Sequence, residues 1–280
     1  MTGAVGMTGD IGTSAHRAKI SPNQSPKAQE NIVSRHPLSV QLYTVRNALE
    51  LDLESTLERV ASLGFTTVEL YNFVDRASEY ASLLPQFGLR PSSAHVHLVG
   101  AELPAVFDAA NAVGVSTIIE PLVDAERWTT AADIAATATE LNSASAAAAS
   151  AGLIVGYHNH WWELENSIDG VTALEVFESL LDPAVVLEVD TYWATVAGTD
   201  ASALLTRLGD RVRFIHVKDG DISKVDENQT AVGSGRVPVA QILAAAPQAV
   251  RVVELDDFAG DVFDALADSV SFLVANGEHV

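Results

Sequence analysis

The chain has 280 residues, 48% of them hydrophobic, which is enough for one large α/β barrel or for two small domains. It carries 37 acidic and 16 basic side chains and a formal charge of −21, so electrostatic repulsion disfavours nucleic acid as a partner. No cysteine is present, which excludes disulfides, Fe–S clusters and Cys-ligated zinc. A metal must therefore be held by His, Asp and Glu.

The N-terminal segment, residues 1–36, is predicted to be a flexible tail. It is rich in Gly, Ser, Thr, Pro and Asn and has no apolar stretch typical of a secretory signal; Met7 is an alternative start. The most apolar helical stretch, residues 131–151, is interrupted by acidic and amide side chains, which argues against a membrane span. We expect a cytoplasmic protein whose catalytic domain covers residues 37–280.

From residue 38 onward, eight short β-rich runs alternate with amphipathic helical patterns. The predicted strands are residues 38–45, 66–72, 90–97, 116–121, 153–160, 185–192, 212–219 and 251–257. Between the first two, Leu53, Leu57 and Val60 share one helical face, and Gly64 follows where a left-handed backbone ends the helix. Such alternation requires a parallel sheet, and eight units predict a single (β/α)₈ barrel. A doubly wound sheet would need a glycine-rich turn after its first strand, and no GxGxxG occurs.

Polar side chains gather where the predicted strands end, which in a parallel barrel is the active-site end. Alternation places His158 with His160, and Glu188 with Asp190, on one side of their strands. Imidazoles and carboxylates from four consecutive strands predict a site for Mn²⁺, Zn²⁺, Co²⁺ or Mg²⁺. Each side chain alone is equally well explained as a hydrogen-bonded group at the barrel end. Four together would carry a heavy desolvation cost without a metal or ligand.

Several motifs are weak alone but specific in combination. They are SVQLYTVR (39–46), GFTTVELY (64–71), GYHNHWWEL (156–164), VVLEVDTYWATVAGTD (185–200), FIHVKDGD (214–221), VGSGRVPVAQIL (232–243) and VVELDDF (252–258). With them the sequence resembles the sugar (phosphate) isomerase/epimerase superfamily, whose fold is a xylose-isomerase-like TIM barrel, over residues 38–273. The YHNH and HVKD motifs resemble a subgroup of keto-sugar lyases and dehydratases.

The resemblance implies one divalent ion, Mn²⁺ foremost, held by Glu, Asp, His and Glu on strands five to eight. Three positions match directly: Asp190, His216 and Glu254. On strand five, His158 stands where the family most often has Glu. Either His158 or His160 supplies the fourth ligand, or Glu163 folds back from the loop, and we favour an imidazole. Glu163 has an equally good role as acceptor of the spare N–H of a ligating histidine.

A metal bound to a carbonyl oxygen stabilises the charge that develops when a neighbouring C–H proton is removed. The resembled enzymes use the resulting enediolate for isomerisation, epimerisation or β-elimination. Because the family's epimerases use two glutamates and the strand-five one is missing here, we expect β-elimination from a keto-sugar or keto-glycoside, with isomerisation or epimerisation as the alternative. The candidate catalytic residues are His158, His160, Lys218 and Glu254. Lys218 is either an electrophile beside the metal or a structural ion pair with Asp219.

A carbohydrate is the expected small-molecule partner. The candidate substrate-binding residues are His95, His97, Glu120, Tyr192, Trp193 and Asp256. A purely structural role is the alternative for several of these residues, because histidines at a barrel end form hydrogen bonds and tryptophans pack under loops. Only Lys218 and Arg236 are available for a phosphate, which favours a neutral substrate.

Two other function classes fit the sequence less well than a metal-dependent sugar enzyme. A relative that cuts abasic DNA would need a basic groove, which the charge disfavours. A non-catalytic sugar or metal binder has no need for four convergent ionisable ligands. The protein is a candidate homo-oligomer, since oligomers are common in the resembled family.

Overall fold

The computed structural model describes residues 1–4, 6, 9 and 36–280. Residues 36–280 belong to one compact unit. The tail predicted over residues 1–36 lies largely outside the described residues, so its flexibility and the domain boundary stay predictions.

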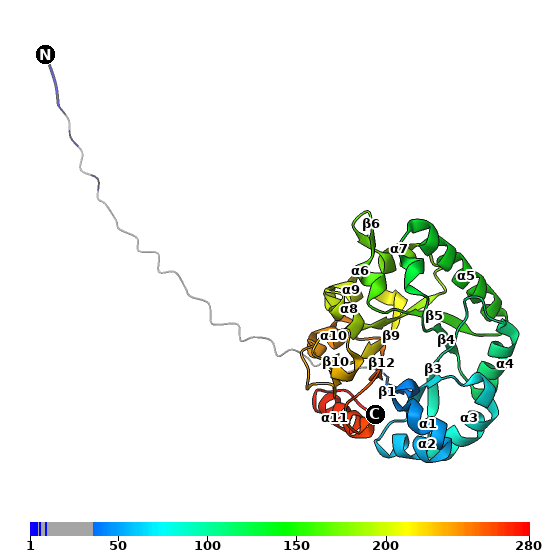
Figure 1. The fold of residues 1–280 in the computed structure, drawn as a ribbon. Coiled ribbons are helices and arrows are strands. Elements are labelled where there is room, and N and C mark those ends of the chain that lie inside the picture. The colour runs from blue at the N-terminus through cyan, green and yellow to red at the C-terminus, as the bar shows by residue number, and fades with distance from the viewer. Residues whose placement is uncertain (5, 7–8, 10–35) are drawn as a thin grey trace. The chain divides into compact units, whose positions relative to one another are not determined.

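Eight parallel strands close into a barrel, which confirms the predicted fold class. They follow one another around the barrel in chain order, and the last pairs with the first (Figure 1). The barrel strands are β1 (Ser39–Gln41), β2 (Thr67–Tyr71), β3 (Arg90–His95), β4 (Thr117–Glu120), β5 (Ile154–His158), β8 (Val186–Asp190), β9 (Val212–Val217) and β12 (Val250–Val253).

Helices surround the ring of strands (Figure 1). They include α1 (Arg46–Leu51), α2 (Leu53–Ser62), α3 (Ala77–Leu83), α4 (Leu103–Val113), α5 (Ala131–Ser150), α7 (Ala173–Leu180), α9 (Ala201–Leu208), α10 (Val239–Ala245) and α11 (Val262–Ala275). Two short helices follow β5 and β8 directly: α6 (Trp162–Glu165) and α8 (Thr191–Val196). Single 3₁₀ turns span Leu42–Val45, Val74–Arg76, Leu84–Phe87, Ala125–Trp128, Gly209–Arg211 and Asp226–Asn228. Two small antiparallel pairs complete the unit: β6 (Ser167–Ile168) with β7 (Val171–Thr172), and β10 (Asp219–Gly220) with β11 (Gln229–Thr230).

Helix α2 forms as its sequence predicts. The Asp52 carboxylate accepts the Ser55 N–H at 3.0 Å and caps the first turn. Leu57 and Val60 are fully buried on the barrel side. Gly64 has φ +102°, which ends the segment in a backbone conformation that glycine adopts at little cost.

Two strands end earlier than predicted because a polar side chain caps the turn that follows. Gln41 Oε1 accepts the N–H of Tyr43 at 3.0 Å, so the chain turns into a 3₁₀ helix after β1. The Asp190 carboxylate accepts the N–H of Trp193 at 2.8 Å and starts α8. Tyr43 and Tyr192 therefore lie in helical turns and not at strand ends.

Apolar side chains fill the interior towards the amino-terminal ends of the strands. Ile119, Phe214 and Val252 form a separate buried cluster there. Gly156 leaves room for this cluster, since a Cβ at that position would lie 3.0 Å from Ile119 Cγ1. Most of the buried ionisable side chains of residues 36–280 lie towards the carboxyl-terminal end of the barrel.

The last residues of the chain help to close the barrel. Ser39 of β1 pairs with Val252 of β12, and the N–H of Leu38 donates to the carbonyl oxygen of His279 at 2.7 Å. Arg251 is fully buried, and its Nε lies 3.4 Å from a carboxylate oxygen of Glu278.

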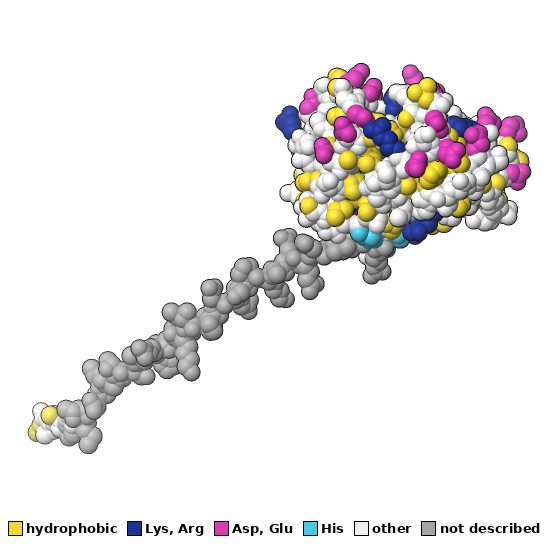
Figure 2. Space-filling model, turned by 90° about the horizontal axis from the view of Figure 1, so that it is seen from below, with side chains coloured by type: hydrophobic (Ala, Val, Ile, Leu, Met, Phe, Trp, Pro, Cys, Tyr) yellow, Lys and Arg dark blue, Asp and Glu magenta, His cyan; other side chains and the backbone are white. Residues whose placement is uncertain are grey.

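Acidic side chains are spread over the face drawn in Figure 2, with basic and apolar ones between them. Within the described residues, no helix combines the length and hydropathy that a membrane crossing needs.

Candidate active site

A cavity of about 530 Å³ opens at the carboxyl-terminal end of the barrel. Its apolar side includes Tyr43 and Tyr71, whose rings meet edge to face at 4.9 Å. Its polar side is formed by His95, His97, His158, His160, Glu254 and Asp256. Six of the residues predicted for the site therefore line one cavity.

The three residues predicted as metal ligands from the resemblance lie together, and one of them, Glu254, lines the cavity. We call Asp190, His216 and Glu254 the outer group. His216 Nδ1 lies 2.6 Å from Glu254 Oε2 and 4.0 Å from Asp190 Oδ2. All three side chains are buried, and their ligand atoms lie within 4.8 Å of one another.

Lys218 reaches into the outer group. Its ammonium lies 2.9 Å from Asp190 Oδ2, 2.7 Å from Glu254 Oε2 and 2.7 Å from Asp256 Oδ2. Burial alone would lower the pKa of Lys218, but these carboxylates hold it well above its usual value. The ion pair with Asp219 that the sequence offered as an alternative is not among the ion pairs of residues 36–280.

The outer group fits a divalent cation. Asp190 Oδ2 is buried and receives no hydrogen bond of good geometry from the described residues, and the Lys218 ammonium 2.9 Å away shows that a positive charge is accommodated beside it. Two carboxylates and an imidazole are donors that Mn²⁺, Co²⁺ and Zn²⁺ accept. Of the fourth ligands considered, His158 is positioned to add one, because its Nε2 lies 3.9 Å from Asp190 Oδ2.

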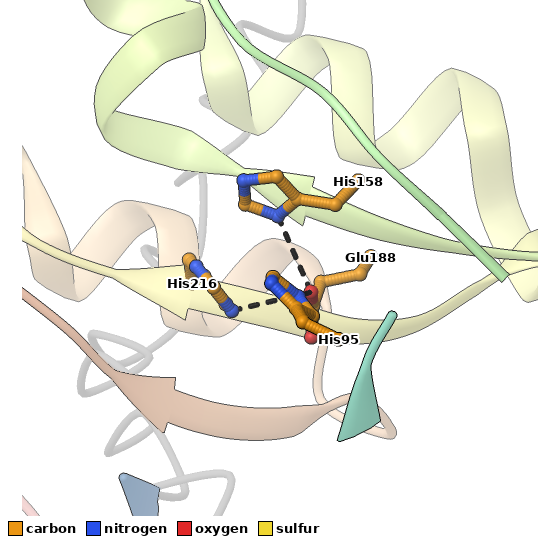
Figure 3. Close-up of side chains that lie close together, drawn as sticks. All are labelled: His95, His158, Glu188 and His216. Carbon is orange, nitrogen blue, oxygen red and sulfur yellow. Dashed lines mark hydrogen bonds and ion pairs between the residues drawn. The ribbon is translucent and has the colours of Figure 1, made fainter. Parts of the chain in front are cut away.

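A second cluster lies one strand step deeper, because Glu188 precedes Asp190 by two residues. We call His95, His158 and Glu188 the inner group. Figure 3 shows it together with His216, with the rings turned towards the Glu188 carboxylate. Glu188 Oε2 lies 2.5 Å from His95 Nε2 and 3.2 Å from both His158 Nδ1 and His216 Nε2.

Glu69 borders the inner group from β2. Its Oε1 lies 2.8 Å from His216 Nε2 and 3.3 Å from His95 Nε2. It also accepts hydrogen bonds from the Gln41 amide at 2.7 Å and from the Ser93 hydroxyl. The carboxylate is therefore held in one orientation between two imidazoles.

Burial and neighbouring charges shift the pKa values of these groups in opposite directions. Burial and the neighbouring His216 lower the pKa of His158 to about 3, so this ring is neutral. Burial would lower the pKa of His216, but Glu188 and Glu254 hold it well above its usual value. Burial raises the pKa of Asp190 to about 6, against the effect of Lys218.

His160 faces the cavity as a neutral base. Burial and the neighbouring His158 hold its pKa well below the usual value. Its ring stacks on Trp162 at 4.4 Å, and its Nδ1 is buried without a hydrogen-bond partner in the described part of the chain. A neutral imidazole with an unused nitrogen at a cavity is suited to accept a proton.

Glu163 supports the His160 backbone and not a histidine ring. Its carboxylate accepts the hydroxyl of Tyr157 at 2.7 Å and the backbone N–H of His160 at 3.0 Å. The expected hydrogen bond from the ring of a ligating histidine is not among these contacts. Burial raises the pKa of Glu163 to about 8.

His97 lies at the exposed rim of the same cavity. Its Nδ1 is 2.9 Å from Glu120 Oε1, and this hydrogen bond raises the pKa of His97. Glu120 is fully buried and also accepts the N–H groups of Leu98 and Val99, so it orders the loop after β3. Glu120 thus positions His97, while the cavity lining formed by residues 36–280 does not include it.

Tyr192 and Trp193 also lie outside the lining formed by residues 36–280. The Tyr192 hydroxyl donates to the Ser223 carbonyl oxygen at 3.1 Å, and Trp193 is buried below Lys218, whose ammonium is 5.7 Å from the ring. Both aromatic side chains therefore pack under the loops, which was the alternative to binding substrate.

The sequence places Gln41 and Glu69 at the active-site ends of predicted strands but assigns neither of them a role in the site. Glu188 was recognised only as the partner of Asp190 in the strand alternation. The available signal was its position two residues before a predicted ligand, which places a second charged side chain in the barrel interior.

The chain was compared with known proteins. Residues 57–255 match the family described as the xylose isomerase-like TIM barrel. No curated protein sequence resembles the chain closely enough to count as a match.

Solved structures show the same fold at low sequence identity. A sugar phosphate isomerase/epimerase from Parabacteroides distasonis is 22% identical with a TM-score of 0.74, covering 90% of this chain and 96% of that one. A probable 3-DHS dehydratase from Bacillus anthracis, AsbF, is 13% identical with a TM-score of 0.69, covering 85% and 99%. The IOLI protein, solved with a zinc atom, is 15% identical with a TM-score of 0.68, covering 86% and 98%. The family match extends over most of the barrel, and the chain belongs to the xylose isomerase-like TIM barrel family.

Proposed function

We propose that this protein is a divalent-metal-dependent enzyme that removes a proton next to the carbonyl of a keto-sugar or keto-glycoside and eliminates the β-oxygen substituent. The observation that carries the proposal is the outer group beside a cavity lined by His160 and His97, whose pKa values are shifted in opposite directions. Asp190, His216 and Glu254 would hold the ion, with His158 as the fourth ligand. A divalent ion there supplies a Lewis acid for the substrate oxygens.

The two histidines divide the proton transfers. Neutral His160, which lines the cavity, accepts the C–H proton, and the electron pair left on carbon becomes the enediolate. Collapse of the enediolate forms a carbon–carbon double bond and breaks the C–O bond to the β-substituent. His97, whose pKa is raised by its hydrogen bond to Glu120, gives a proton to the departing oxygen. Pairs of groups whose environments separate their pKa values are typical of acid and base partners.

A neutral carbohydrate suits the cavity. Lys218 is the cationic side chain nearest the site, and three carboxylates already surround it. A phosphate group would be repelled by these carboxylates. The tyrosine pair on the opposite wall offers an apolar surface for a sugar ring or for the substituent that leaves.

The test follows substrates by NMR in D₂O. Metal-free protein is supplied with Mn²⁺ and incubated with 3-keto-glycosides, free ketoses and ketose phosphates. We expect release of the substituent and an unsaturated keto-sugar from the keto-glycosides. Glu254→Gln should abolish turnover, and His160→Gln should lower it by about 10²–10⁴, the usual contribution of a positioned base. His279→Gln, a histidine change at the opposite end of the barrel, is the matched control.

Isomerisation or epimerisation through the same enediolate is the second candidate, and the Parabacteroides distasonis neighbour carries that description. It would give deuterated stereoisomers without any released substituent. That result, or full turnover without a metal, contradicts the proposed reaction.

A further inference from the structure

The inner group contains buried polar atoms that the proposed reaction leaves unused. Three imidazole nitrogens lie within 3.2 Å of one oxygen of Glu188, while the other oxygen, Oε1, is buried without a hydrogen bond from any described residue. His158 Nδ1 also lacks a hydrogen bond of good geometry within the described residues. An unsatisfied buried acceptor costs about 1–3 kcal/mol, so a purely hydrogen-bonded network would spread its donors over both oxygens.

The spacing between His158 and Glu188 matches that of metal ligands, whereas His95 Nε2 and Glu188 Oε2, 2.5 Å apart, would separate to admit an ion. In a tetrahedral zinc site with bonds of about 2.0–2.1 Å, neighbouring ligand atoms lie about 3.3 Å apart. His158 Nδ1 and Glu188 Oε2 are 3.2 Å apart, and the four side chains drawn in Figure 3 have ligand atoms within 4.8 Å of one another. Convergence on one point is what a shared cation requires.

The two groups use different nitrogen atoms. His158 turns Nδ1 towards Glu188 of the inner group. His216 turns Nδ1 towards the outer group and Nε2 towards Glu69 and Glu188. An inner ion can therefore bind without taking any donor atom from Asp190, His216 or Glu254. When both ions are bound, His158 serves the inner ion and the outer ion keeps these three ligands. His216 then keeps Nε2 for a hydrogen bond to a carboxylate, as ligating histidines usually do.

We propose that His95 Nε2, His158 Nδ1 and Glu188 Oε2 form a second divalent-cation site beneath the outer group. Two imidazoles and one carboxylate suit a borderline ion such as Zn²⁺ or Mn²⁺. Glu69 Oε1, 3.3 Å from His95 Nε2, is available as a further ligand and is already oriented by Gln41. This site goes beyond the proposed function, which needs only the outer ion.

The test counts metal ions on the full chain. Metal-free protein is titrated with Zn²⁺ by calorimetry, and the bound metal is measured by mass spectrometry after desalting. We expect two ions per chain for the unchanged protein. Glu188→Gln should remove the inner ion and Glu254→Gln the outer one, leaving one ion in each variant. His97→Gln, a change of a nearby cavity histidine outside both groups, should keep two.

The variants separate the two assignments. A single ion that persists in Glu188→Gln and is lost in Glu254→Gln overturns the inner site and leaves the outer one intact. A single ion with the reverse pattern supports the inner site and overturns the outer one. If Glu188→Gln fails to fold, as judged by circular dichroism, His95→Gln makes the same comparison, and retention of two ions in that variant overturns the proposal.

Discussion

Lys218 is a buried cation that contacts two carboxylates of the outer group. Its ammonium lies within 2.9 Å of Asp190, Glu254 and Asp256. Breaking a buried ion pair by removing one partner costs about 3–5 kcal/mol, because the remaining charge stays buried. An ammonium and a divalent ion at the same carboxylates compete for them.

Lys218→Met should therefore destabilise the metal-free protein and strengthen its response to metal. We expect a lower melting temperature in the presence of chelator and a larger rise on adding Mn²⁺ than in the unchanged protein. The measurement is a thermal melt with and without the ion. Lys224→Met is the matched control, since Lys224 is half exposed and pairs with Glu165. Equal metal-induced shifts in Lys218→Met and the unchanged protein would show that the lysine does not compete.

The candidate ligands were predictable because strand ends of a parallel barrel meet at one edge. This places Asp190, His216 and Glu254 together without knowledge of any distance. The sequence does not show which nitrogen of His216 faces which carboxylate, since that depends on ring orientation and on Glu69, which is 147 residues away. For the same reason the sequence offers only its neighbour Asp219 as an ion-pair partner for Lys218, while the structure pairs it with carboxylates of other strands.

The loop after β9 is organised by the side chain of Asp219. Its carboxylate accepts the N–H groups of Gly233, Gly235 and Val237 at 2.9–3.0 Å. The GSG segment at residues 233–235, too short for a dinucleotide fingerprint, thus holds a carboxylate of its own chain. The loop carries Lys218 and Gln229, and both donate to Asp256 at the cavity.

Gly235→Ala should disturb this loop. A Cβ at that position would lie 2.1 Å from Asp219 Oδ1 and 2.3 Å from the backbone nitrogen of Gly220, so the loop must move. Overpacking of this kind typically costs about 1–3 kcal/mol, and we expect a lower midpoint of urea unfolding together with reduced turnover. Ser234→Ala, at the exposed neighbouring position, is the control. An unchanged midpoint for Gly235→Ala would refute the role assigned to Asp219.

At the level of elements, the sequence predicts all eight strands in order but extends several of them too far. Residues 38–45 and 185–192 read as continuous strands because apolar and β-branched residues run through their ends. Whether a chain turns after Gln41 or Asp190 is decided by a side chain that caps the next N–H groups, and Gln41 is not a common capping residue. Helix α2 had the stronger signals, an acidic cap and a terminal glycine.

Across the whole unit, closure depends on residues near the end of the chain. Arg251 is fully buried in β12, with its guanidinium donating to the Ala249 and Leu243 carbonyl oxygens and facing Glu278. Burial lowers the pKa of Arg251, against the effect of Glu278. This carboxylate is the group that offsets the buried positive charge.

Glu278→Ala should lower the free energy of unfolding by about 3–5 kcal/mol, because it leaves the Arg251 charge buried without its carboxylate. Chemical denaturation followed by circular dichroism measures the loss. The double variant Arg251→Met with Glu278→Leu replaces the pair by apolar side chains of similar size and should recover most of the stability. Equal stability of Glu278→Ala and the unchanged protein would contradict the pairing.

The contact between β1 and β12 has a consequence for the order in which the barrel is made. Ser39 and Val40 pair with Val252 and Val253, so the first strand meets its second neighbour only after almost the whole chain has been synthesised. Until then one edge of β1 presents unpaired N–H and C=O groups, the kind of edge that invites pairing with another chain. Contacts this remote in sequence also form slowly, since their loop-closure entropy must be overcome first. The newly made protein is therefore most exposed to aggregation in the interval before residues 250–280 leave the ribosome.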